Sequence, residues 1–450
     1  MDRARLRHLL ARESAEAERC NPRSRDAYAR AAHLFGRVPM TWMNKTAGAF
    51  PRYLDSARGA RVSDIDGHTY VDFCLGDTGA MAGHSPAPVA DAVQRRFSEL
   101  GGATAMLPTE DAEWVGADLT RRFGLPRWSF ALTATDANRW AIRLARAVTG
   151  RPKILVNSYC YHGSVDESLI VTDPHGGPGL PRPGNVGAPC DVTLTSRVAE
   201  FNDLDGLERA LAHGDVAAVL MEPALTNIGI VLPDPGYLEG VRALTRRHGT
   251  LLVNDETHTF SAGPGGCTAA WGLEPDVLTI GKAIGGGIPT AAYGLSAELA
   301  DRLLGRADLD LVDMGGVGGT LAGNALSVAA TRATLEHVLT DAAFARMDTL
   351  SARFEAGVRA GVEAHGLSWS VSRLGARTEY RFADPAPRTG TEAEAAADPE
   401  LEDFLHLFLA NRGILLTPFH NMALMCPDTT EEDVDLHTGL FASALAELTG

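Results

Sequence analysis

The sequence predicts an α/β fold with a large, mostly parallel sheet domain and a smaller α+β domain. The chain has 450 residues, which is more than one hydrophobic core usually serves, so two domains are expected. Between about residue 129 and residue 300, short apolar runs alternate with longer helical stretches or loops, a pattern typical of a parallel sheet. These runs read SFAL, KILV, AAVLM, TLLV and VLTI. From about residue 325 onward, long helical patterns flank a few short strands, which indicates the second domain.

The domain boundaries and loops follow from the same patterns. We expect residues 1–75 to contribute to the small domain, residues 76–325 to form the large domain and residues 326–450 to complete the small one. In the stretch DANRWAIRLARAVTG, apolar side chains recur at helical spacing, and Gly150 follows as a C-cap. The tracts at 175–189 and 384–400, rich in proline, glycine and polar residues, are expected to be surface loops.

The composition argues against several classes of function. The formal net charge of -16, with no basic stripe along the chain, disfavours nucleic acid as a partner. No apolar run is long enough to cross a bilayer, and the charged start lacks the features of a secretory signal, so we expect a cytoplasmic protein. The six cysteines are scattered without a CxxC pair or a Cys/His cluster, so no metal site is predicted.

The residues that carry chemistry are expected where strands end, because ligands of an open α/β sheet bind beyond the carboxyl ends of its strands. HGTLLVNDETHT leads one apolar strand into Asp255, and DVLTIGKAIGGGIP leads another to Lys282. SFALTATDAN ends in a hydroxyl-rich turn at Thr133, Ala134 and Thr135 that opens a helix. Successive strand ends therefore supply a carboxylate, an amine and a helix N-terminus.

Each of these features has a structural and a chemical interpretation. Lys282 is either a lysine whose ammonium reaches water or a Schiff-base lysine that condenses with an aldehyde cofactor. Asp255 is either a capping or salt-bridged carboxylate or the partner of a protonated pyridine nitrogen. The backbone N–H groups at Ala134 and Thr135 suit a phosphate dianion. Together they are the three anchors that pyridoxal phosphate requires, which favours the chemical interpretation.

The motifs resemble those of the class III aminotransferases and, within them, the glutamate-1-semialdehyde aminomutase branch, over roughly residues 50 to 330. In chain order they are SDIDGHTYVDF, YCYHG, MEPALTNIG, HGTLLVNDE, LTIGKAIGGGIP and GGTLAGNAL. The resemblance implies a fold type I pyridoxal-phosphate-dependent transferase, with Lys282 in the Schiff-base position and Asp255 on the pyridine nitrogen.

The resemblance also implies further cofactor contacts. Tyr161 would stack on the cofactor ring with His162 beside it, and Asn227 would lie near the phenolic oxygen. Thr320 would reach the phosphate from a neighbouring subunit, which implies a homodimer with shared active sites. His258 stands where the family often has Gln or Met; it would donate to the phenolic oxygen or be a hydrogen-bonded histidine of the turn.

The sequence departs from the resembling family on the substrate side. Trp42, next to Met43, falls where the aminomutase branch has the arginine that binds the substrate carboxylate. His420 and Asn421 fall where that branch carries a glutamate. Arg377 or His420 is then the candidate for a carboxylate contact from the second domain.

The predicted function is a pyridoxal-phosphate-dependent aminotransferase that moves an amino group from an amine or amino acid donor to an oxo acid through a pyridoxamine intermediate. The alternative is an intramolecular aminomutase of the glutamate-1-semialdehyde 2,1-aminomutase type, or an epimerase on the same scaffold. A nucleotide-binding dehydrogenase is disfavoured because no GxGxxG stands between a strand and a helix. A cofactor-free binding protein is disfavoured by the presence of Lys282 and Asp255.

Overall fold

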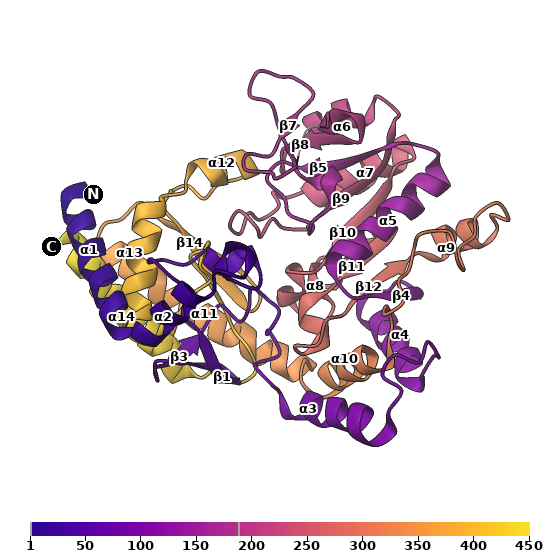
Figure 1. Cartoon of the computed structure of the whole chain (residues 1–450). Coiled ribbons are helices and arrows are strands. Elements are labelled where there is room, and N and C mark those ends of the chain that lie inside the picture. Colours follow the sequence, from indigo (N-terminus) through magenta and orange to yellow (C-terminus); the bar gives the residue numbers. More distant parts are fainter. Residues whose placement is uncertain (1, 188–189) are drawn as a thin grey trace. The chain divides into compact units, whose positions relative to one another are not determined.

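The computed structural model describes residues 2–187 and 190–450, and these divide into two compact units (Figure 1). Unit 1 contains Met1–Pro86, Ala342–Ala386 and Ala396–Gly450, and unit 2 contains Ala87–Asp341 and Pro387–Ala395. The last two residues of the tract expected as a loop at 175–189 lie outside the described residues.

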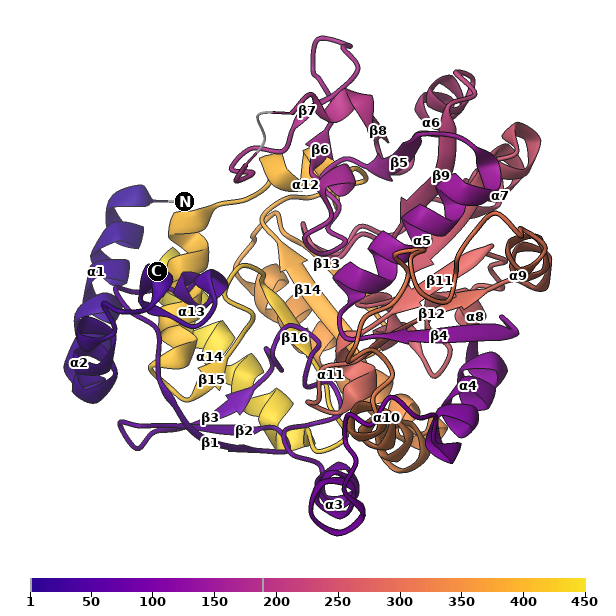
Figure 2. The ribbon, with the colours of Figure 1, turned by 45° about the vertical axis from the view of Figure 1, so that its right-hand side comes forward.

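Unit 2 is built on a sheet that has seven strands within the described residues, in the order β4-β12-β11-β10-β9-β5-β8 (Figure 2). Only β12 runs against its neighbours β11 and β4; the other strand pairs of this sheet are parallel. The mostly parallel sheet that the apolar runs predict is therefore confirmed. The strands are β4 (Arg127–Ala131), β5 (Lys153–Asn157), β8 (Ser196–Ala199), β9 (Val216–Met221), β10 (Leu251–Asp255), β11 (Val277–Ile280) and β12 (Ala291–Leu295).

Helices cover both faces of this sheet. Each of the six residues of β9 is therefore buried. The helix α5 (Ala134–Thr149) begins where its sequence predicts: the Thr133 hydroxyl accepts a hydrogen bond from the Asp136 N–H at 3.1 Å. It ends at Gly150, which has a φ of 68° and is the expected C-cap. The remaining helices of unit 2 are α3 (Ala87–Gln94), α4 (Glu110–Phe123), α6 (Leu204–Leu211), α7 (Tyr237–His248), α8 (Gly266–Ala270), α9 (Ala297–Leu304), α10 (Ala325–His337) and α12 (Gly390–Ala395).

Two segments of unit 2 differ from the sequence-based boundaries. The helix α10 packs against α3 and α4, so the unit boundary falls after this helix and not at residue 325. The tract 384–400 is not a plain loop: it contains α12, where the Thr391 hydroxyl donates to Glu200 at 2.5 Å. The tract 175–189 contains the short strand β7 (Leu180–Pro181), paired with β6 (Ile170–Val171).

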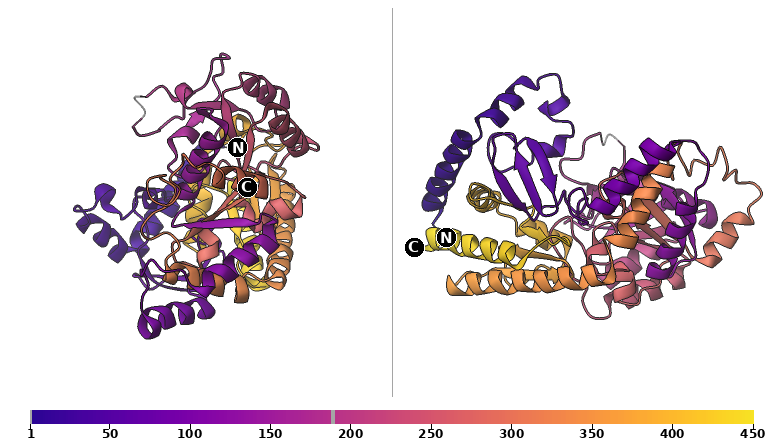
Figure 3. Two further views of the ribbon diagram at one scale, coloured as in Figure 1. Left: turned by 90° about the vertical axis from the view of Figure 1, so that its right-hand side faces the viewer. Right: turned by 90° about the horizontal axis from the view of Figure 1, so that it is seen from below.

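Unit 1 combines small sheets with long helices. Its N-terminal strand β3 pairs in parallel with β15, which comes from the C-terminal part of the chain. Figure 3 shows α11 running beside α14, where the rings of Phe354 and His437 lie 4.3 Å apart. The strands are β1 (Leu54–Arg58), β2 (Arg61–Asp64), β3 (Thr69–Asp72), β13 (Ser370–Leu374), β14 (Arg377–Arg381), β15 (Ile414–Leu415) and β16 (Met422–Leu424). The helices are α1 (Arg3–Cys20), α2 (Pro22–Arg30), α11 (Asp341–Ala364), α13 (Pro399–Ala410) and α14 (Glu431–Thr449).

Candidate active site

The predicted amine and carboxylate follow two neighbouring strands of unit 2. Asp255 is the last residue of β10 and is in register with Thr279 of β11, and Lys282 follows β11 after a single glycine. The Nζ atom of Lys282 lies 2.8 Å from the Nε2 atom of His258. Lys282 has a φ of 48°, in the left-handed region that non-glycine residues seldom adopt. Strained backbone of this kind concentrates at functional sites.

The carboxylate of Asp255 is 3% exposed and is held by three donors. Its Oδ2 atom accepts from Asn138 Nδ2 at 2.8 Å and from His162 Nδ1 at 2.9 Å, and its Oδ1 atom accepts from the Thr257 N–H at 3.0 Å. A carboxylate accepts about four hydrogen bonds. Oδ1 can therefore take one further donor, and the N–H of a protonated pyridine ring is a donor of that kind.

The charge on Asp255 is stabilised by its neighbours. Burial alone would raise the pKa of Asp255, but the hydrogen bond and charge of His162, with the bonds from Thr257 and Asn138, lower it to about 2. Burial lowers the pKa of His162, but Cys160 and Asp255 together raise it well above its usual value. Asp255 is therefore an ionised carboxylate at neutral pH, suited to hold a cation.

The N-terminus of α5 lies against the segment that carries Lys282. A Cβ atom on Gly281 would be 3.1 Å from the Ala134 Cβ and 3.2 Å from the Ala134 backbone nitrogen. A Cβ atom on Gly163, where φ is 81°, would be 2.1 Å from the Thr135 Oγ1. The Thr135 Oγ1 also accepts from the Ser164 N–H at 3.1 Å, so its own O–H can point to an anion. The N–H groups at the N-terminus of α5, together with this hydroxyl, suit a phosphate group.

The other cofactor contacts implied by the resemblance stay predictions. Tyr161 is half-buried and immediately precedes His162, which does reach Asp255. Asn227 is half-buried and forms an isolated bridge with Gly229. Thr320 is exposed in the segment between α9 and α10.

Three of the predicted substrate residues adjoin one another in unit 1. The ring of Trp42, 38% exposed, lies 5.6 Å from the ring of Phe419, which lies 4.9 Å from that of His420. His420 Nδ1 is 3.4 Å from a carboxylate oxygen of Glu379. Asn421 follows His420 directly and is fully buried.

The remaining two substrate candidates have opposite surroundings. Met43 is 48% exposed. Arg377 has no exposed surface; its guanidinium donates to the Thr78 hydroxyl at 2.7 Å and to the Met422 sulfur at 3.3 Å. Arg377 is thus an internal residue of unit 1, and its contact with a substrate carboxylate stays a prediction.

Sequence reasoning missed two buried polar residues beside Asp255. Asn138 of α5 bonds both Asp255 and the backbone carbonyl of His162, and it accepts from the Thr279 hydroxyl at 2.7 Å. Glu222, which follows β9, is 1% exposed. In the sequence, each of these residues is a polar position among apolar ones, on a helix or at a strand end. This pattern indicates burial but does not identify the hydrogen-bond partner.

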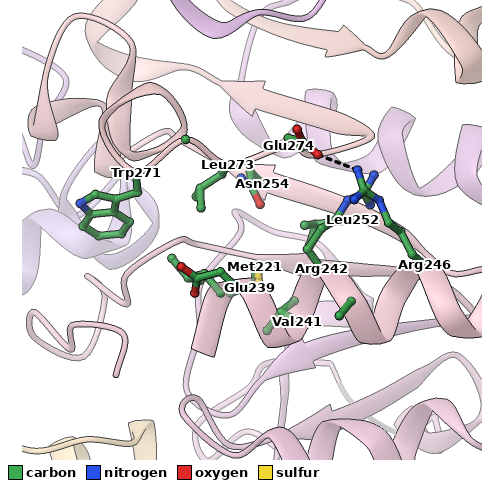
Figure 4. A pocket seen from close by; sticks show the side chains of 13 residues that line it. Met221, Glu239, Val241, Arg242, Arg246, Leu252, Asn254, Trp271, Leu273 and Glu274 are labelled. Atoms are coloured by element: carbon green, nitrogen blue, oxygen red, sulfur yellow. Dashed lines mark hydrogen bonds and ion pairs between the residues drawn. The ribbon is translucent and has the colours of Figure 1, made fainter. Parts of the chain in front are cut away.

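A separate pocket of about 310 Å³ lies between α7 and the face of the sheet formed there by β9 and β10 (Figure 4). It is lined by β9, β10, α7 and the segment 271–274, with Arg246 and Glu274 paired at 2.6 Å. Leu252 and Asn254 of β10 face it, and since successive strand residues face opposite ways, Asp255 points away from it. The pocket is not part of the cluster around Lys282.

The described residues also limit other kinds of site. Among residues 2–187 and 190–450, no helix is long and apolar enough to cross a membrane. The same residues hold no group of three or more His, Cys, Asp or Glu side chains arranged to bind a metal ion.

Comparison with known proteins supports the family resemblance. The model of the family described as aminotransferase class-III matches residues 42–445. Glutamate-1-semialdehyde 2,1-aminomutase of Anaeromyxobacter sp. (strain Fw109-5) is 33% identical to this chain over 405 residues, which cover 89% of the chain and 92% of that protein.

Solved structures match along nearly the whole chain. A glutamate-1-semialdehyde aminomutase from Pseudomonas aeruginosa PAO1, solved in complex with PMP, is 50% identical with a TM-score of 0.96, and the match covers 100% of this chain and 99% of that one. An omega-transaminase from Sphaerobacter thermophilus is 29% identical with a TM-score of 0.85, covering 95% and 98%. The fold type I architecture that the resemblance implies is confirmed.

Proposed function

Because this chain belongs to the class III aminotransferase family, whose members use pyridoxal phosphate, we propose that it is an aminomutase that moves an amino group between two carbons of one substrate. The substrate class we propose is a small amino aldehyde that bears a carboxylate, of the glutamate-1-semialdehyde kind. Pyridoxal phosphate is the cofactor.

One observation carries the choice of reaction. The likeness to an aminomutase extends over the whole chain at 50% identity, against 29% for an omega-transaminase. The sequence alone ranks net amino transfer first and migration second, and the comparisons support the second reading better.

The residues of unit 2 have separate roles in this proposal. When bound, pyridoxal phosphate withdraws electrons from the substrate carbon that bears the amino group. Lys282 would hold the cofactor through its Nζ atom, and its amine would move a proton at the substrate carbon. Asp255 would keep a proton on the ring nitrogen, and the N-terminus of α5 at Ala134 and Thr135 would hold the phosphate.

The second candidate function is net transfer of an amino group from a donor to an oxo acid. The residues predicted to contact the substrate favour it. Trp42 stands where the aminomutase branch has a carboxylate-binding arginine, and its ring packs on Phe419. An apolar wall of this kind suits a substrate with an aromatic or aliphatic group. Asn421, where the branch has a glutamate, points the same way.

A single experiment separates the two candidates. The cofactor-loaded protein is incubated with ¹⁵N-labelled glutamate 1-semialdehyde without an amino acceptor, and the position of the label is followed by NMR. We expect many turnovers in which the label moves to the neighbouring carbon. Turnover that stops after one equivalent, with a carbonyl product released and restored only by an added oxo acid, would establish a transaminase instead.

We infer that the protein works as a homodimer. Unit 2 exposes large apolar side chains in two loops, with Met106 77%, Leu107 71%, Val312 98% and Met314 80% exposed. A second copy of the chain would cover such exposed apolar side chains, and the predicted role of Thr320 requires a second copy. We expect light scattering under assay conditions to give twice the mass of the chain, and an active monomer would contradict this inference.

A further inference from the structure

Glu222 is a buried acid without a role in the proposed reaction. It follows the carboxyl end of β9, in the same sheet as Asp255, and is 1% exposed. The Thr226 hydroxyl donates to its Oε2 atom. Its Oε1 atom has no hydrogen-bond partner among the described residues.

His162 has a matching vacant atom. Its Nδ1 donates to Asp255 at 2.9 Å, and its Nε2 is buried without a partner in the described part of the chain. Asn254 of β10 is in register with Met221 of β9. The next residues, Asp255 and Glu222, are therefore neighbours at the ends of two adjacent strands, and His162 is bonded to Asp255. The charges of His162 and Asp255 also act on the pKa of Glu222, lowering and raising it respectively. Buried polar atoms are nearly always paired, so two vacant atoms on neighbouring titratable groups call for a shared occupant.

The charges of this group favour a mobile proton. Burial raises the pKa of Glu222 to about 7, against the opposing effects of His162 and the Thr226 hydroxyl. The groups that face the pair are Asp255, on β10, and Cys160, whose thiol lies near His162. With one proton shared between Glu222 and His162, the net charge of Asp255, Glu222 and His162 together is about -1. This charge balances the single positive charge of a protonated ring nitrogen.

We propose that Glu222 is a positioning residue for the cofactor, whose carboxyl group exchanges one proton with Nε2 of His162, directly or through one water, and so sets the charge that Asp255 presents to the ring nitrogen. In one form the Glu222 O–H bond is intact and His162 is neutral, with its proton on Nδ1. In the other form that O–H bond is broken, an N–H bond has formed on Nε2, and the pair is a carboxylate and an imidazolium. Atoms and charge balance between the two forms.

The consequence appears at alkaline pH. When the shared proton is lost to solvent, the Glu222 carboxylate adds a second negative charge beside the site, and the ring nitrogen keeps its proton more tightly. Without Glu222 this second charge is absent. The inference rests on the proposed function only in that pyridoxal phosphate binds at Asp255; it holds for migration and for net transfer alike.

The test measures the ring nitrogen and not turnover. The protein is loaded with pyridoxal phosphate carrying ¹⁵N in its ring, and the ¹⁵N chemical shift is followed from about pH 6 to pH 10. We expect Glu222→Gln to lose the ring proton about one pH unit below the wild type, a tenfold change in proton affinity, and Glu222→Asp to restore part of the difference.

Glu256→Gln is the matched control. Glu256 is as deeply buried and follows Asp255 directly, but both its oxygens are bonded, to Thr268, Thr259 and the Cys267 N–H. We expect this variant to lose stability and to keep the wild-type ring titration. An equal shift in Glu222→Gln and Glu256→Gln, or no shift in Glu222→Gln, would overturn the inference.

A second measurement uses the cofactor-free wild type, so it depends neither on cofactor binding nor on whether a variant folds. The ¹⁵N signal of His162 Nε2 in the cofactor-free wild type is expected to change as Glu222 titrates, while Nδ1 stays bonded to Asp255. An Nε2 signal that is constant between about pH 6 and pH 9 would contradict the shared proton. If the protein binds no pyridoxal phosphate at all, the proposed function fails, whereas the His162 titration still decides the proton exchange.

Discussion

The Nζ atom of Lys282 lies 2.8 Å from the Nε2 atom of His258, within hydrogen-bond distance. The sequence places His258 either at the phenolic oxygen of the cofactor or in the hydrogen bonds of its own turn. The structure adds a contact with the reactive amine. The imidazole is thus in position to exchange a proton with Nζ whenever that amine is not bonded to carbon.

Replacing Lys282 with alanine is expected to abolish covalent attachment of the cofactor. Borohydride treatment of the wild type should fix pyridoxal phosphate to one peptide containing Lys282, and turnover of Lys282→Ala should fall by at least about a hundredfold, since proton transfer by this group is lost. Lys153→Ala is the control, because the Lys153 amine is paired with Asp215 at 3.4 Å. Reduction onto Lys153 would show that the site has been misplaced.

Asp255→Ala is expected to separate cofactor binding from chemistry. The phosphate contact at α5 stays, but the ring nitrogen loses its carboxylate, so we expect kcat to fall by about a hundredfold or more. Removing the acceptor of Asn138 and His162 should also lower the free energy of unfolding by about 1 to 3 kcal/mol. Steady-state kinetics and urea unfolding measure the two effects, and near-normal kcat would mean that Asp255 is only structural.

Gly163→Ala is expected to damage the phosphate site through its contact with Thr135. An added Cβ would lie 2.1 Å from the Thr135 Oγ1, so the helix N-terminus must move. Gly176→Ala is the control, because Gly176 has a similar φ of 79° but nothing within 4 Å of the added atom. Both variants should lose about 1 to 2 kcal/mol from the left-handed backbone. Only Gly163→Ala should weaken pyridoxal phosphate binding, measured by equilibrium dialysis. Equal affinities of the two variants for the cofactor would contradict a phosphate site at the N-terminus of α5.

Glu222 makes the stability of the protein depend on pH in a defined direction. Its folded-state pKa of about 7 is above the ordinary value of 4.5, and burial is the main cause. Its contribution to the free energy of unfolding is therefore fully present below about pH 4.5 and is lost as the pH rises through 7. The rise in the pKa of Glu222 from 4.5 to about 7 corresponds to about 3 kcal/mol at most. Urea unfolding between these pH values should show a smaller loss in Glu222→Gln than in the wild type, and identical slopes would contradict the assignment.

The strands and the two central residues could be predicted from the sequence because their signals are local. Apolar runs such as TLLV and VLTI define the strands, and a charged residue two positions after each run, Asp255 and Lys282, marks the strand end. The Thr133 turn and Gly150 likewise mark the ends of α5 by their residue types alone.

Contacts between distant segments could not be predicted in the same way. Asn138 bonds Asp255, which is 117 residues further along the chain, and Glu222 interacts with groups on other elements of the unit. An arginine such as Arg377 is usually exposed, so nothing local indicates that it lies inside unit 1. The helical pattern of α10 shows that one face is buried but not which unit covers it.

The return of residues 387–395 to unit 2 limits how the protein can be divided. A Cβ atom on Gly390 would lie 2.1 Å from the Ser158 carbonyl oxygen, and Asn202 donates to the Arg388 carbonyl at 2.9 Å. A recombinant fragment ending at residue 341 would expose these groups to solvent, although it would contain every cofactor residue of that unit. To isolate unit 2, residues 387–395 must therefore be supplied as a separate peptide or joined to the fragment through a short linker.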